Sequence, residues 1–295
     1  MTTNPFGRVI TAMVTPMRPD GSVDEEGVRA VVEHLLASGH DGIVVNGTTG
    51  ESATLTDDES IEVVRVAKEV VGERAAITAG VGSNDTAHCV EMAARAAGAG
   101  ADALLLVSPY YNKPTQAGLL AHCRAVADST ELPIMLYDIP GRTGVEFSTS
   151  TLVALAEHPR IVAVKDAKAD LWASTHVMAS TDLLWFSGDD VLSLAHLAQG
   201  AVGVVSVVGH VAGKEYAAML AAVDAGDLAT ARDIHRRLIP AVDAIMTTSQ
   251  GAIMAKAALV ELGVIGSAFV RLPLVESPPE HLETLRKGLA ESGLR

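Results

Sequence analysis

The sequence is poor in aromatic residues, in cysteine and in positive charge, and each shortage excludes a class of protein. Only 3% of the 295 residues are aromatic, so we expect helices and strands packed through Ala and Val. The two cysteines, Cys89 and Cys123, form no CxxC motif and no metal spacing, which argues against a secreted disulfide framework. With 22 Lys and Arg against 36 Asp and Glu, the formal net charge is −14. This acidic balance argues against nucleic acid and anionic membranes as partners.

Long apolar runs are also missing. The longest apolar stretch, Ala201–Val208, is far too short to span a bilayer. The first residues, Met1–Pro5, lack the basic and apolar segments of a secretory signal. We therefore expect a cytoplasmic protein with reduced thiols and no membrane partner.

A repeated pattern of short apolar runs and helical stretches fills the first three-quarters of the chain. Most of the runs are continuous, which is typical of strands covered on both faces. Helical stretches fill most gaps, and one opens with Thr56-Asp57-Asp58-Glu59, a capping-box sequence. The predicted strands are Arg8–Val14, Gly42–Asn46, Ala75–Ala79, Ala103–Val107, Pro133–Asp138, Ile161–Lys165, Leu183–Ser187 and Ala201–Val207.

Eight strand–helix units in series predict an α/β fold, the (β/α)8 TIM barrel, with an open doubly wound sheet as the alternative. After Gly226 the strand pattern stops, and 227–247, 250–262 and 279–292 read as helices. We expect a barrel domain over 1–225 and a C-terminal helical domain over 226–295. In such barrels the active site lies at the C-terminal ends of the strands.

Lys165 interrupts the apolar run Ile161–Ala167. Lysine is rarely buried without a reason, and desolvation lowers the pKa of its ammonium group. A neutral amine in a pocket can form a Schiff base with a carbonyl substrate. Strand alternation predicts that Ile161, Ala163 and Lys165 share one face, directed into the barrel. The alternative is a lysine at a strand end that extends to water.

The preceding strand ends in Tyr137 and leads to Arg142 after a Pro-Gly pair. Neighbouring strands would bring Tyr137 close to Lys165, where a phenol can relay protons. Arg142 is suited to binding a carboxylate. The alternatives are a half-buried aromatic residue and a solvated loop charge.

Two further strand ends carry candidate groups. Glycines flank Thr48 and Thr49, so this loop could expose N–H groups to a carboxylate, while Glu51 either braces the loop or is solvated. Tyr110 and Tyr111 follow the fourth strand, and in an extended segment only one of them can point to the site.

The last two strand ends carry acidic residues and a histidine. Asp189 and Asp190 lack partners with metal-ligand spacing, so we expect no metal and interpret one of them as a helix cap. His210 could act as a base, although a structural role is the more common one.

These segments together resemble a known family. The segments Gly47–Glu51, Tyr110-Tyr111, Tyr137–Gly144 and Lys165-Asp166 are similar to those of the dihydrodipicolinate synthase family, in order and over nearly the whole chain. That family belongs to the pyruvate-dependent class I aldolases, which include N-acetylneuraminate lyase. The resemblance implies condensation of pyruvate with L-aspartate 4-semialdehyde, in diaminopimelate and lysine biosynthesis, without a metal or organic cofactor.

The resemblance also implies a role for each matching residue. Lys165 would form the Schiff base with pyruvate. A proton relay would join Tyr137, Thr48 and Tyr111, with Tyr111 supplied to the site of an adjacent subunit. Members of the family are commonly homotetramers built as dimers of dimers. The remaining implied roles are pyruvate binding by Thr49, Gly188 and Val205 and semialdehyde binding by Arg142.

Some positions depart from the family pattern. Gly209-His210 stands where relatives often carry an asparagine. Relatives that are inhibited by lysine use histidines and a glutamate where this chain has Asp57, Ser60 and His88, so we expect weak inhibition or none. The positions Ser52, Ala53, Asn84 and Tyr110 would still fit. Two alternatives stay open, namely a lyase for sugar acids or 2-oxo acids, and a non-catalytic barrel.

Overall fold

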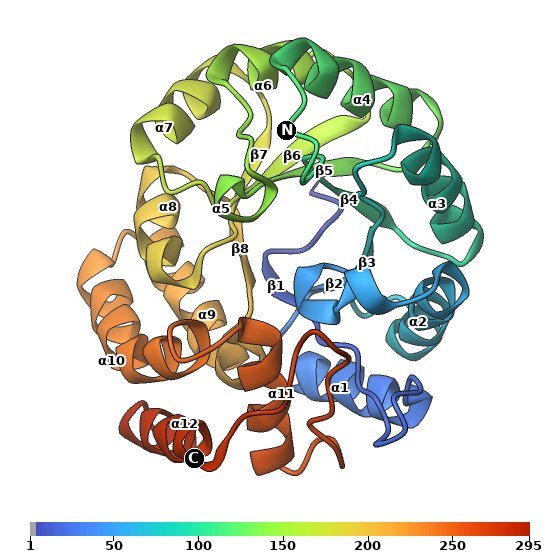
Figure 1. Ribbon diagram of the computed structural model, residues 1–295. Helices are drawn as coiled ribbons and strands as arrows, with labels where there is room; N and C mark the ends of the chain where they lie inside the picture. Colours follow the sequence, from blue (N-terminus) through green and yellow to red (C-terminus); the bar gives the residue numbers. More distant parts are fainter. Residues whose placement is uncertain (1–3) are drawn as a thin grey trace.

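Eight parallel strands close into a barrel in sequence order, with β1 paired to both β2 and β8 (Figure 1). The computed structural model describes residues 4–295. The predicted (β/α)8 fold is confirmed, and the open-sheet alternative is wrong because no edge remains between β1 and β8. The strands are β1 (Val9–Ala12), β2 (Gly42–Val45), β3 (Ala76–Gly80), β4 (Ala103–Val107), β5 (Ile134–Asp138), β6 (Ile161–Asp166), β7 (Leu184–Ser187) and β8 (Gly203–Ser206).

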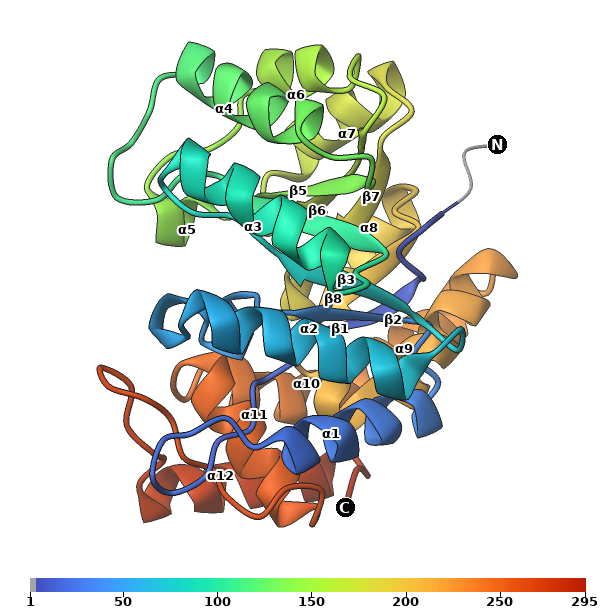
Figure 2. The same cartoon turned by 90° about the vertical axis from the view of Figure 1, so that its right-hand side faces the viewer.

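The helices between the strands form the outer layer (Figures 1 and 2). The predicted capping box opens α2, where Thr56 accepts from the Glu59 N–H and Glu59 accepts from the Thr56 N–H. The helices of this layer are α1 (Glu25–Ala37), α2 (Asp57–Val71), α3 (Thr86–Gly98), α4 (Gln116–Asp128), α6 (Thr149–Leu155), α7 (Leu171–Ser180), α8 (Ser193–Gln199) and α9 (Gly209–Asp224). The loops after the strands contain the short helix α5 (Pro140–Thr143) and the helical turns η1 (Thr48–Gly50), η2 (Ser52–Thr54) and η3 (Asp190–Leu192).

Two separate hydrophobic clusters lie on the two faces of the barrel. One lies between the strands and the helices, and a smaller one fills the barrel lumen, including Ala163 and Phe186. The prediction that Ile161 shares the face of Ala163 and Lys165 is wrong. The register between β5 and β6 shifts by one residue at Val162, so Ile161 packs in the outer cluster while Ala163 faces the lumen.

Three helices follow the barrel, α10 (Leu228–Met246), α11 (Gly251–Glu261) and α12 (Pro279–Glu291). They match the predicted helices to within one residue at each end, and they lie beside α9 and α1 on one flank of the barrel (Figure 2). The division into domains at 225 and 226 stays a prediction. No helix within residues 4–295 combines the length and the apolar character that a membrane span needs. The prediction about the N-terminal segment falls partly on residues 1–3, outside the described residues.

Candidate active site

Lys165 lies at the C-terminal end of β6, directly opposite Tyr137 of β5 in the strand register. The side chain is only 4% exposed, and its Nζ lies 4.0 Å from the centroid of the Tyr137 ring. The predicted pairing of these two residues is therefore confirmed. The alternative of a lysine extending to water is wrong, because the barrel wall encloses the amine.

The surroundings of Lys165 lower the pKa of its ammonium group. Burial lowers the pKa of the ammonium group to about 7, the positive charge of Arg142 acts in the same direction, and Asp190 opposes both. Burial raises the pKa of the Tyr137 phenol to about 12. At neutral pH the site therefore offers an amine of which a substantial fraction is neutral and nucleophilic, beside a phenol that keeps its proton.

The end of β7 provides the space that Lys165 occupies. A Cβ atom at Gly188 would lie 2.7 Å from Lys165 Cγ and 3.0 Å from its Cε, closer than side chains normally approach. The Gly188 N–H also donates to the Asp166 carbonyl at 2.7 Å. Val205 of β8 packs in the lumen cluster with an exposure of 1%. Gly188, directly after β7, thus borders Lys165, and Val205 packs in the lumen cluster with Ala163.

The loop after β2 forms the turn that the glycines predicted. Gly50 N donates to Gly47 O at 3.0 Å, so Thr48 and Thr49 begin a short helical turn whose first N–H groups need no partner within the turn. The Thr15 hydroxyl holds the loop from β1 by donating to Gly50 O at 2.7 Å. Within residues 4–295, the N–H groups of Thr48 and Thr49 have no acceptor. The turn therefore presents free donors at the barrel mouth.

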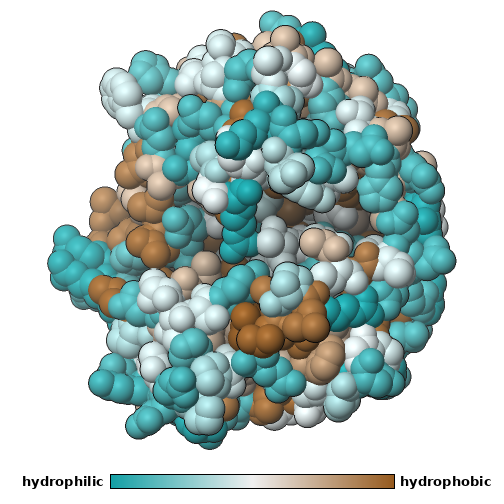
Figure 3. Space-filling view, in the orientation of Figure 1, coloured by the Kyte–Doolittle hydropathy of each residue, from teal (hydrophilic) through white to brown (hydrophobic). Residues whose placement is uncertain are grey.

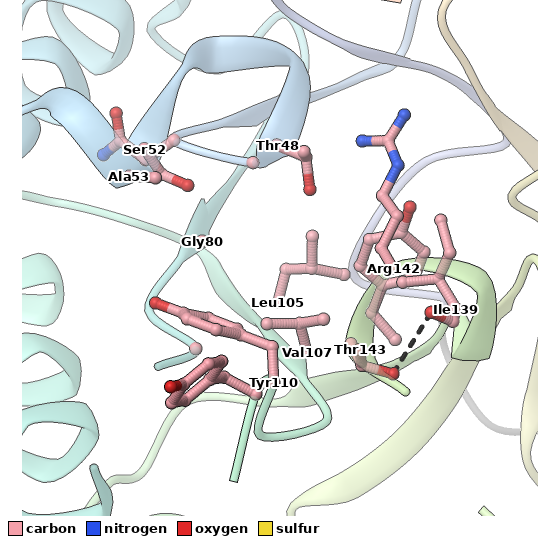
Figure 4. A pocket seen from close by; sticks show the side chains of 15 residues that line it. Thr48, Ser52, Ala53, Gly80, Leu105, Val107, Tyr110, Ile139, Arg142 and Thr143 are labelled. Carbon is pink, nitrogen blue, oxygen red and sulfur yellow. Dashed lines mark hydrogen bonds between the residues drawn. The ribbon is translucent and has the colours of Figure 1, made fainter. Parts of the chain in front are cut away.

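A cavity of about 320 Å³ opens between these strand ends, visible as the hollow at the centre of the face in Figure 3. Thr48, Tyr110, Tyr111, Tyr137 and Arg142 all contribute to its lining. In Figure 4 Thr48 and Tyr110 lie on opposite sides of the cavity, with the apolar side chains of β4 between them. Tyr137 lines this cavity and contacts the Lys165 amine through its ring face, whereas Lys165 itself is not among the lining residues.

Arg142 stands in α5, the single helical turn that lies over the barrel mouth in Figure 1. Its neighbour Thr143 fixes the turn by donating to Ile139 O at 3.1 Å, the bond drawn in Figure 4. Arg142 is exposed, and its guanidinium has no acidic partner among residues 4–295. In a chain of net charge −14, this is a local positive group that remains free for an anion.

The tyrosine pair departs from the extended segment that we expected. Tyr111 has φ of +72°, and Asn112 N donates to Tyr110 O at 2.9 Å, so the chain turns sharply at Tyr111. This turn brings both tyrosines to the cavity edge, although Tyr111 remains 89% exposed. A bulky residue in this backbone region is strained, and such strain gathers at functional sites.

The predicted relay is not closed within one chain. Among residues 4–295, no hydrogen bond joins the hydroxyl groups of Thr48, Tyr111 and Tyr137, although all three side chains line the same cavity. The high exposure of Tyr111 leaves its phenol in solvent at the rim. Within one chain, the three hydroxyl groups therefore form no continuous path for a proton.

The candidates after β7 and β8 are structural. Asp189 caps η3 by accepting from Val191 N at 3.0 Å, as predicted. Asp190 is buried and accepts from the hydroxyl groups of Ser206 and Tyr216. His210 is fully buried, and its Nε2 accepts from the Val14 N–H at 3.1 Å, which confirms the structural interpretation.

Sequence reasoning missed two residues that contact the loop after β2 from the C-terminal part of the chain. Lys256 of α11 pairs with Glu51, and the Arg271 N–H donates to the same carboxylate at 2.9 Å. Glu51 therefore braces the loop, one of the two roles that were left open. The signal was present, because Lys256 interrupts an apolar helical run just as Lys165 interrupts an apolar strand.

Comparison with known proteins agrees with this geometry. Residues 5–292 match the model of the dihydrodipicolinate synthetase family. The 4-hydroxy-tetrahydrodipicolinate synthase of Kineococcus radiotolerans is 56% identical over 290 residues, which cover 98% of this chain and 94% of that protein. The corresponding synthase of Acidothermus cellulolyticus is 54% identical over 289 residues, covering 98% of this chain and 93% of that protein.

Solved structures of the same family are similar to this chain over nearly its full length. The dihydrodipicolinate synthase of Cyanidioschyzon merolae, determined with lysine bound, superposes with a TM-score of 0.96 at 42% identity. The superposition covers 99% of this chain and 100% of that one. The barrel, the lysine at its sixth strand and these matches over nearly the full length lead to one conclusion: the chain belongs to the dihydrodipicolinate synthetase family.

Proposed function

We propose that this chain catalyses the 4-hydroxy-tetrahydrodipicolinate synthase reaction, in which pyruvate condenses with L-aspartate 4-semialdehyde. It is a lyase that works through a Schiff base, as class I aldolases do. The observation that carries the proposal is the buried amine of Lys165, whose pKa is lowered to about 7 beside the Tyr137 phenol. This amine can attack a carbonyl carbon without first losing a proton to a strong base.

The first half of the reaction takes place on Lys165. Its amine adds to the ketone carbon of pyruvate, and the resulting carbinolamine loses water to give an iminium. Tyr137 supplies the proton that leaves with the hydroxyl group, which fits a phenol that is still protonated at neutral pH. The free N–H groups of Thr48 and Thr49 hold the pyruvate carboxylate, with Gly188 and Val205 at the adjoining strand ends. The Tyr137 phenolate then takes up a methyl proton, which gives the enamine and restores the phenol.

The second half joins the acceptor aldehyde. The enamine carbon attacks the aldehyde carbon of the semialdehyde, and the aldehyde oxygen takes up a proton. The amino group of the semialdehyde then attacks the iminium carbon, which closes the ring and releases Lys165. Arg142 binds the carboxylate of the semialdehyde at the entrance. A free guanidinium favours this acceptor over a sugar acid, whose hydroxyl groups call for neutral donors and acceptors.

We further infer a homotetramer built as a dimer of dimers. Tyr111 is 89% exposed at the cavity rim and does not close the relay in its own chain, which supports its donation to the site of a second subunit. Two exposed apolar side chains elsewhere support a further contact, because Trp172 on α7 is 71% exposed and Val191 in η3 is 53% exposed. Sedimentation of the wild type tests the tetramer, and Tyr111→Phe tests the exchanged residue by a fall in kcat.

We also propose that lysine inhibits this chain weakly or not at all. Ser52, Ala53 and Tyr110 line the cavity. His88, which stands at one of the altered positions, is held by Asp57, which stands at another, at 3.0 Å. These groups are therefore already engaged. Half-inhibition by lysine at sub-millimolar concentration would contradict the proposal.

Peptide mapping after borohydride reduction tests the Schiff base. With pyruvate present, we expect a reduced adduct on Lys165, which also blocks tryptic cleavage after this residue. Lys168, three positions away, is the internal control, because its ammonium group is held by Glu146 at 3.1 Å. An adduct on Lys168, or none, would remove the premise. Lys165→Ala should lose both the adduct and the activity while keeping the fold.

A further inference from the structure

The C-terminal helices are connected to the catalytic loop through a buried charge. Glu51 follows Thr48 and Thr49 after one intervening glycine, Gly50, and is 4% exposed. Lys256 of α11, which is 0% exposed, donates to one Glu51 oxygen and, at 2.7 Å, to Phe269 O. These partners lie 205 residues apart in sequence. Removing either member of such a pair leaves the other as an unpaired buried charge, which strongly destabilises the folded state.

Arg271 completes the arrangement from the segment between α11 and α12. Its backbone N–H donates to the second Glu51 oxygen at 2.9 Å. Its guanidinium donates to Thr54 O at 2.6 Å and to Glu59 at 2.8 Å, so it spans the residues that follow the loop. Both carboxylate oxygens of Glu51 thus accept hydrogen bonds from residues that follow the barrel in the sequence.

The backbone at Glu51 explains why this attachment matters. Glu51 has φ of +58°, in the left-handed region that a glutamate seldom adopts. The chain reverses there between η1 and η2, and the side chain is directed inward to Lys256. A strained residue of this kind keeps its conformation only where its surroundings impose it. The loop is also anchored to the segment after β1, where the Thr15 hydroxyl donates to Gly50 O.

We propose that Lys256 and Arg271 are positioning residues for the reaction, which act through Glu51 to hold the Thr48-Thr49 turn against the substrate. The C-terminal helices are then part of the catalytic apparatus. This inference rests on the proposed function only for its kinetic consequences, since the loop position can be measured without a substrate.

The test compares Lys256→Met with Arg286→Met in the full-length protein. Arg286 also belongs to the C-terminal helices, but it pairs with Glu261 on the surface at 2.6 Å and is not bonded to the loop. For Lys256→Met we expect at least a tenfold rise in the pyruvate KM, per folded enzyme, and a slower formation of the borohydride-trapped adduct. Hydrogen exchange of the amides in residues 47–52 should become at least tenfold faster. The Arg286→Met variant should match the wild type in all three.

The readouts separate positioning from stability. A purely structural role would lower the folded fraction and kcat together and leave the pyruvate KM and the exchange of residues 47–52 unchanged; that result would overturn the inference. If Lys256→Met does not fold, Glu51→Gln takes its place with the same expected changes, because it removes the charge that pairs with Lys256 and keeps the size of the side chain. If the wild type forms no pyruvate adduct, the proposed function fails, and hydrogen exchange alone still decides the positioning role.

Discussion

Replacing Gly188 by alanine should displace the catalytic lysine with little effect on the rest of the fold. The new Cβ would lie 2.7 Å from Lys165 Cγ, whereas carbon atoms in contact normally lie about 3.5–4.0 Å apart. The backbone φ of Gly188 is not in the positive region, so alanine is opposed mainly by the lysine side chain, and at 3.1 Å by the Asp166 carbonyl oxygen, but not by its own backbone conformation. The Lys165 side chain must therefore move by roughly 1 Å.

This displacement sets the size of the kinetic effect. A misplacement of about 1 Å at a reacting group costs about 100-fold in rate, equivalent to about 2.7 kcal/mol. Overpacking of a tight site also costs about 1–3 kcal/mol of folding stability. We therefore expect Gly188→Ala to remain folded, with a loss of about 100-fold in the rate constant for adduct formation with pyruvate.

The assay is single-turnover trapping of the pyruvate adduct with borohydride, read by mass spectrometry, together with a thermal unfolding curve. Gly98→Ala is the matched control, since a Cβ at Gly98 would meet no atom within 4 Å. This control should react at the wild-type rate. If Gly188→Ala also formed the adduct at that rate, the lysine would not be confined as the structure describes, and the reasoning would be refuted.

Three further predictions concern charge. The trapping rate should rise with pH to a plateau above about 7, the pKa of Lys165, and a rise that continues toward pH ~10 would contradict the lowered pKa. Arg142→Leu should still form the adduct, but should raise the semialdehyde KM about 10- to 100-fold; because a positive charge is removed, the midpoint of the trapping profile should move to higher pH. Burial lowers the pKa of His40 to about 4 and that of His210 to about 3. The unfolded chain therefore binds more protons below pH ~6.5, and each histidine should cost about 2 kcal/mol of stability at pH 5; urea unfolding at pH 7.5 and pH 5 measures this loss, and His210→Gln should remove about half of it.

Local patterns explain how much of this fold could be predicted. A continuous apolar run marks a strand covered on both faces, and each of the eight predicted runs contains an observed strand or overlaps it in all but one residue. Lys165 was found in the same way, because a charge inside such a run is costly and therefore informative. Its pairing with Tyr137 followed from the order of the strands, since consecutive units in a barrel are neighbours.

The sequence by itself determined the eight strand–helix units and the strand ends at which polar groups gather, because side-chain periodicity is a local property. The tertiary structure decided register and distant pairing. The shift at Val162 turned Ile161 outward, which alternation cannot reveal because one extra residue exchanges the two faces. Lys256 carried the same sequence signal as Lys165, but only the packing of α11 against the barrel brought it to Glu51, 205 residues away. The partner of a buried charge therefore depends on how distant parts of the chain pack against one another.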